Sequence, residues 1–103
     1  MANPEVDYAR RLLRPAFRHE EGRFLAEGPH VVRDALDAGA EIDTVFVSFE
    51  RSEDASIATL VAEAERRGAR IHQIHGRDLL RIADTETPQG IIAVVRRAPE
   101  LAA

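Results

Sequence analysis

Five arginines near the start of the chain are the residues best suited to contact a charged ligand. They are Arg10, Arg11, Arg14, Arg18 and Arg23. Only two carboxylates, Glu20 and Glu21, lie between the first and the last of them. A guanidinium group stays charged and offers planar, bidentate donors that match phosphate oxygens, so the segment predicts a local phosphate-binding surface. The alternative is a bias in composition, because all 14 basic residues of the chain are arginines.

A second set of candidates consists of one glutamate and a polar loop. Glu27 ends a predicted strand, and no partner for acid–base catalysis is evident. We therefore expect it to form an ion pair with Arg18 or Arg23 that fixes a loop. The polar loop Asp84–Gly90 precedes the last predicted strand and carries neutral hydrogen-bonding groups. These belong to Thr85, Thr87 and Gln89. They contact a base or a backbone, or they simply face solvent.

The common patterns of catalytic and cofactor-binding sites are missing from the chain. It has no Gly-rich dinucleotide loop, no phosphate loop ending in Gly-Lys-Ser/Thr and no Gly-x-Ser-x-Gly elbow. The absence of cysteine excludes disulfides, Cys-ligated zinc and thiol nucleophiles. His72 and His75 lie three apart in a predicted strand, which points their side chains to opposite faces. We predict no catalytic residue, no metal site and no cofactor site in this chain.

Length and composition indicate one globular domain. The chain has 103 residues, of which 45% are apolar and 31% are charged, and its net charge is −4. Such a composition excludes wholesale disorder, and the overall negative charge argues against indiscriminate binding of polyanions. No window approaches the roughly 20 consecutive apolar residues of a membrane span, and no signal peptide is evident. We predict a cytoplasmic protein that does not bind membranes.

Helical and strand patterns alternate along the chain. Helices are predicted from Pro4 to about Leu13, from Gly28 to Gly39, from Ser52 to Gly68 and shortly after Gly76. Strands are predicted at Arg23–Glu27, Ile42–Phe49, Arg70–His75 and Ile91–Val95. Residues 15–22 are predicted to be a polar connection. This alternation favours a three-layer α/β/α sandwich with a four-strand parallel or mixed sheet, and the apolar run 42–49 is typical of a central strand.

The few aromatic residues divide into two groups. Phe24, Phe46 and Phe49 are predicted to lie in the core, because each falls in a predicted strand. Tyr8 and Phe17 remain as candidates for stacking on nucleic-acid bases. For these two we favour packing against the sheet.

Two motifs resemble a known family. One is Phe24-x-x-Glu27-Gly28-x-x-x-Val32-x-x-Ala35-Leu36, and the other is Thr87-Pro88-Gln89-Gly90-Ile91-x-Ala93-Val94. Both, in this order and at this separation, resemble the N-terminal substrate-binding domain of SpoU/TrmH-type RNA ribose methyltransferases. The resemblance covers nearly the whole chain.

The resemblance implies a fold similar to that of kink-turn-binding ribosomal proteins. It also implies that residues 1–103 hold rRNA or tRNA beside a separate, knotted catalytic domain, which is absent from this chain. That domain would bind S-adenosylmethionine and methylate a ribose 2′-hydroxyl, in a parent protein that is a homodimer. The family's basic, RNA-facing residues match Arg10, Arg11, Arg14, Arg18 and Arg23. Its Glu-Gly pair matches Glu27 and Gly28, and its loop before the last strand matches Thr85, Thr87, Pro88, Gln89 and Gly90. Of these, the resemblance implies RNA contacts for Thr85, Thr87 and Gln89. It implies a structural role for Glu27, Gly28, Pro88 and Gly90.

Three functions are consistent with these observations. The leading hypothesis is a non-catalytic RNA-recognition domain of a methyltransferase. The main alternative is a docking or dimerisation module that touches no RNA, which the acidic overall charge supports. The third is a free-standing kink-turn binder, which is disfavoured because such proteins are usually basic throughout.

Overall fold

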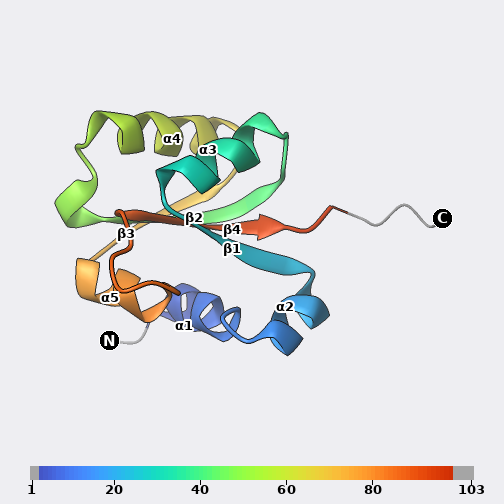
Figure 1. The fold of residues 1–103 in the computed structure, drawn as a ribbon. Helices are drawn as coiled ribbons and strands as arrows, with labels where there is room; N and C mark the ends of the chain where they lie inside the picture. The colour runs from blue at the N-terminus through green and yellow to red at the C-terminus, as the bar shows by residue number, and fades with distance from the viewer. Residues whose placement is uncertain (1–2, 99–103) are drawn as a thin grey trace.

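The computed structural model describes residues 3–98, which form a sheet with helices on both of its faces (Figure 1). In chain order the elements are α1 (Pro4–Arg11), α2 (Pro15–Glu21), β1 (Arg23–Glu27), α3 (Pro29–Asp37), β2 (Ile42–Ser48), the 3-10 helix η1 (Phe49–Arg51), α4 (Ala55–Arg66), β3 (Arg70–Ile74), α5 (Gly76–Arg81) and β4 (Ile91–Arg96). No helix of this part of the chain is long and apolar enough to cross a membrane.

The sheet is mixed, with strand order β1-β4-β2-β3. Strand β4 runs antiparallel to both of its neighbours, whereas β2 and β3 are parallel. Helices α3 and α4 cover one face, and α1, α2 and α5 cover the other (Figure 1). The predicted three-layer sandwich with a four-strand sheet is therefore confirmed.

Alternate residues of the central strands supply two separate cores. Val45 and Val47 of β2 point towards α3 and α4, while Phe46 between them packs with α1 and α5. Ile71 and Ile74 of β3 likewise belong to opposite sides, as their three-residue spacing predicts. Burial on both faces explains why β2 and β4 show little polar alternation in sequence.

Residues 15–22 are not the predicted polar connection, because they form helix α2 and its cap. Pro15 occupies the first turn of α2, where its missing N–H and fixed φ are tolerated. Gly22 ends the helix in the left-handed conformation with φ 65°, and its N–H donates to the carbonyl of Arg18. Pro15 therefore both disfavours continuation of α1 and starts α2.

The aromatic predictions hold with one exception. Phe46 is fully buried and Phe24 packs against the core, but Phe49 is 49% exposed. Strand β2 ends at Ser48, whose N–H donates to the carbonyl of Gly90, and Phe49 already belongs to η1. The apolar run 42–49 does not reveal at which residue the pairing of β2 with β4 ends. Tyr8 and Phe17 pack against the α1 side of the core, as predicted.

One end of the sheet gathers four chain segments. The carboxyl ends of β1, β2 and β3 lie beside the amino end of β4, as the strand pairing requires. Gly90 sits there with φ 88°, and a Cβ at this position would come within 2.7 Å of the Cβ of Arg51. Glycine is thus required at residue 90, which keeps the loop before β4 tight against η1.

Candidate nucleic-acid interface

Four of the five predicted arginines cluster around the turn between α1 and α2. Arg10 and Arg11 end α1, Arg14 directly precedes α2, and Arg18 lies within α2. The side chains of Arg10, Arg11 and Arg14 are exposed, and Arg18 is half-buried. Within residues 3–98 none of the four forms an ion pair. The turn therefore carries uncompensated positive charge in a net-acidic chain.

Two of these arginines also hold the two helices together. Arg18 Nη1 donates to the carbonyl oxygens of Leu12 and Leu13, at 2.9 and 3.0 Å. These carbonyls lie at the end of α1, where unpaired oxygens and the helix dipole attract a cation. The guanidinium of Arg11 lies over the ring of Phe17, 4.2 Å from its centroid. Arg10 and Arg14 have no such contacts and are the more available pair.

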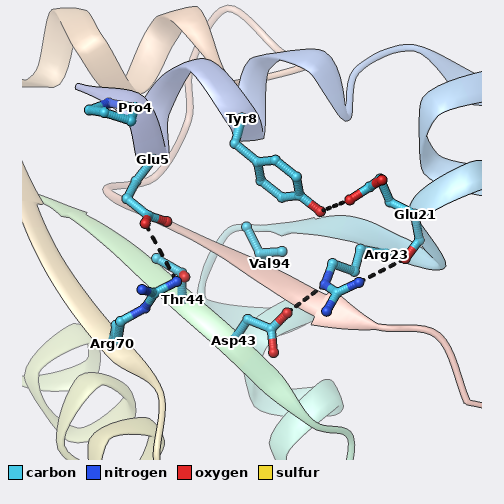
Figure 2. A pocket seen from close by; sticks show the side chains of 9 residues that line it. All are labelled: Pro4, Glu5, Tyr8, Glu21, Arg23, Asp43, Thr44, Arg70 and Val94. Atoms are coloured by element: carbon cyan, nitrogen blue, oxygen red, sulfur yellow. Dashed lines mark hydrogen bonds and ion pairs between the residues drawn. The ribbon is translucent and has the colours of Figure 1, made fainter. Parts of the chain in front are cut away.

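Arg23 differs from the other four because it is ion-paired. Its Nε donates to Asp43 Oδ2 at 2.6 Å, and its Nη1 donates to the carbonyl of Glu21 at 2.8 Å (Figure 2). Asp43 also accepts a bond from Arg96 at 2.8 Å, so one carboxylate joins β1, β2 and β4. A phosphate that approached Arg23 would compete with the carboxylate of Asp43. Nothing in the spacing of the sequence indicated this pairing.

The charges around Asp43 shift its titration. Burial opposes ionisation of Asp43, but hydrogen bonds and charge from Arg23 and Arg96 outweigh it, and the pKa of Asp43 falls below its usual value. Asp43 and Arg23 line a cavity of about 320 Å³ together with Tyr8 (Figure 2). The hydroxyl of Tyr8 donates to Glu21 Oε1 at 2.7 Å. Burial, together with this acceptor, raises the pKa of Tyr8 to about 12.

Glu27 does not pair with Arg18 or Arg23, so that expectation is wrong. Its two carboxylate oxygens accept hydrogen bonds from the N–H of Asp84, at 2.8 Å, and from Thr85 Oγ1, at 2.5 Å. Glu27 does fix a loop, but it is the loop before β4, which is distant in sequence. The carboxylate thereby anchors the segment that carries Thr87 and Gln89.

Two cavities meet at Glu27. The arginine-side cavity, of about 220 Å³, is lined by Glu27 and by Leu12, Leu13, Arg18, Phe24, Leu25, Ile82 and Asp84. The loop-side cavity, of about 300 Å³, is lined by Glu27 and by Gly28, Pro29, His30, Val31, Thr85, Thr87 and Gln89. The arginine-side cavity contains the guanidinium of Arg18 together with the carboxylates of Glu27 and Asp84, whereas no arginine lines the loop-side cavity. The structure thus brings Arg18, alone among the five predicted arginines, to the same carboxylate as the predicted loop residues Thr85, Thr87 and Gln89.

Histidines contribute no metal site to this surface. Within residues 3–98 no group of three or more His, Asp or Glu side chains is arranged to hold a metal ion. His72 stacks on Phe46 and His75 lies beside the exposed Phe49, with ring centroids 5.7 and 5.3 Å apart. The candidate site thus consists of arginines, one anchoring carboxylate and neutral loop residues.

Comparison with known proteins gives a consistent set of relatives. The family model for the MRM3-like substrate binding domain matches residues 3–93. The mitochondrial rRNA methyltransferase 3A of Danio rerio is 35% identical over 80 residues, which are 77% of this chain and 17% of that protein.

Solved structures with the same fold include an RNA 2′-O ribose methyltransferase, with a TM-score of 0.83 and 25% identity over 99% of this chain. An AdoMet-bound rRNA methyltransferase from Sinorhizobium meliloti has a TM-score of 0.78 and 26% identity over 95% of this chain. The chain spans 38% and 35% of these two proteins, so it corresponds to a minor part of each.

Proposed function

This chain belongs to the MRM3-like substrate binding domain family, and we propose that it holds ribosomal RNA for a methyltransferase domain elsewhere in the same polypeptide. The observation that carries the proposal is the cluster of four arginines at the α1–α2 turn, which have no carboxylate partner among the residues that the structure describes. One of the four, Arg18, lines the arginine-side cavity, which meets the loop-side cavity at Glu27. The acidic remainder of the chain disfavours RNA binding over most of the other surface.

The methyl transfer itself belongs to the other domain. The AdoMet-bound relative from Sinorhizobium meliloti supports S-adenosylmethionine as the methyl donor, and the ribose methyltransferase among the relatives supports a 2′-hydroxyl acceptor. The residues of this chain correspond to a substrate binding domain. Their contribution is to bind and orient the RNA.

The arginines divide this task. Arg18 and Arg11 are held by the carbonyls of α1 and by Phe17, so their charges stay at fixed positions. Arg10 and Arg14 extend into solvent and can follow the phosphates of a flexible strand. Phosphate contacts of this kind set affinity and register without reading sequence.

Salt dependence tests the proposal. If each of the four arginines meets one phosphate of a single strand, log K falls with log salt at a slope of about −3. The double variant Arg10→Gln/Arg14→Gln should reduce that slope by about 1.4 and weaken binding to all sequences. The matched control is Arg66→Gln/Arg77→Gln, which removes two exposed arginines that have no ion pair within residues 3–98.

Fluorescence anisotropy with a labelled single-stranded RNA of about a dozen nucleotides measures both variants across a salt series. Equal slopes for the two double variants would remove the α1–α2 turn from the interface. If the wild-type chain binds neither this strand nor a kink-turn duplex, the docking-module alternative takes its place. Preference for the kink-turn duplex would instead favour the ribosomal-type function.

A further inference from the structure

The loop-side cavity differs in chemistry from the arginine cluster beside it. Among the described residues no arginine lines it, and its acidic and basic side chains are those of Glu27 and His30. Both oxygens of the Glu27 carboxylate already accept hydrogen bonds from the loop. A phosphate placed here would meet a negative charge without a guanidinium to offset it. The cavity therefore lacks the guanidinium groups that attract phosphate at the α1–α2 turn.

One side of the cavity is apolar and unusually exposed. Pro29 and Val31 begin α3, and Val31 is 47% exposed, as one of three large apolar side chains with such exposure in the part of the chain that the structure describes. An aliphatic surface of this kind packs well against the face of a flat, weakly polar ring. A charged or strongly hydrated ligand would gain nothing from it.

The lining also offers hydrogen-bonding groups with free capacity. The side chains of Thr87 and Gln89 are exposed and, within residues 3–98, make no hydrogen bond. A hydroxyl and a carboxamide each donate and accept, which suits the mixed donor and acceptor edge of a base. The anchoring of Asp84 and Thr85 by Glu27 holds this part of the loop near α3.

We propose that the loop-side cavity receives one unpaired nucleobase of the bound RNA, with Val31 and Pro29 against the ring and Gln89 and Thr87 at its edge. The cavity, of about 300 Å³, has room for a purine. Glu27 lines both cavities, so a single strand whose phosphates lie on the arginines continues past Glu27 to this point. The proposal rests on the RNA-binding function, to which it adds a site that contacts a base.

A pair of strands with equal charge tests the proposal. One is the labelled single-stranded RNA of about a dozen nucleotides, and the other has the same number of phosphates but stable ribose spacers that lack bases. The wild-type chain should bind the strand with bases about tenfold more tightly. In Val31→Ser/Gln89→Ala this preference should fall at least about threefold, while affinity for the spacer strand stays the same.

The control is Leu80→Ser/Gln73→Ala, which truncates an apolar side chain of similar exposure, 49%, and an exposed glutamine. Neither residue lines the arginine-side or the loop-side cavity. This variant should keep the full preference for bases. Circular dichroism spectra of all variants verify folding, which substitution of the exposed Val31 leaves intact.

Three results would overturn the base site while leaving the RNA-binding function in place. They are a wild-type chain that binds both strands equally, a preference for bases that persists in Val31→Ser/Gln89→Ala, and an equal loss of both affinities in that variant. Failure of the wild-type chain to bind either strand would instead refute the proposed binding of single-stranded RNA, and the base site with it.

Discussion

The anchoring of the loop by Glu27 is open to a quantitative test, a double-mutant cycle between Glu27 and Thr85. The carboxylate accepts two hydrogen bonds, and a bond to a charged group contributes about 1.5–3 kcal/mol when it is well shielded from water. Here Thr85 is exposed and Glu27 is half-buried, so water replaces part of each interaction. We expect Glu27→Ala to lower the free energy of unfolding by about 1–2 kcal/mol and Thr85→Ala to lower it by about 0.5–1 kcal/mol.

The coupling energy of the pair isolates the side-chain bond, which joins Glu27 Oε2 and Thr85 Oγ1 at 2.5 Å. It should be about 0.5–1 kcal/mol, measured from urea unfolding followed by circular dichroism. Glu27→Ala should also speed hydrogen exchange of the Asp84 amide, since that N–H loses its acceptor. Thr85→Ala should leave this acceptor in place.

The control cycle pairs Thr85→Ala with Glu53→Ala, an exposed glutamate that has no ion pair within residues 3–98. That cycle should show no coupling. If the Glu27–Thr85 coupling is equally small and the Asp84 amide exchanges at its wild-type rate in Glu27→Ala, the carboxylate does not anchor the loop in solution. The placement of Thr87 and Gln89 would then lose its support.

Two further predictions concern titrating groups. Tyr8 is the single tyrosine of the chain, so its ultraviolet absorbance should report a pKa of about 12 in the folded protein and about 10 in urea. Its contribution to stability is complete below pH about 10 and is lost as the pH rises towards 12, and Glu21→Gln should lower the folded pKa. Asp43→Asn, which removes the carboxylate shared by Arg23 and Arg96, should lower the free energy of unfolding at pH 7 by about 1–3 kcal/mol. Because Arg23 and Arg96 lower the pKa of Asp43, the wild-type protein should lose this contribution as the pH falls below about 4, and unfolding at acid pH should differ less between the two proteins. A constant difference between them from pH 7 to pH 3 would contradict this assignment.

The elements that the sequence predicted well are those in which local spacing carries enough information. Helix α4 spans twelve residues and presents Ile57, Leu60 and Ala64 to the core at helical intervals. Gly39 and Gly68 follow their helices with positive φ, as expected of helix-ending glycines. Helix α2 was missed because its seven residues include no buried position, so no periodicity marks it.

The hydrogen-bond and ion-pair partners of individual side chains were harder to predict than the helices and strands. Glu27 was expected to bind an arginine close to it in sequence, yet its partner Thr85 is 58 residues away. Arg23 was placed with the other arginines, but Asp43, 20 residues further on, neutralises it. The exposure of Phe49 likewise depends on where β4 stops pairing with β2.

The amino-acid sequence alone determined the alternation of helices and strands, the concentration of arginine near the first helix and the two motifs of the family. These are properties of neighbouring residues, because the helix period, the strand period and helix capping each act over a few residues at a time. The tertiary structure alone decided which arginines remain without a carboxylate and which loop Glu27 holds. Ion pairs and hydrogen bonds act over a few ångströms between side chains that only the packing of the sheet brings together, and no local pattern encodes that distance.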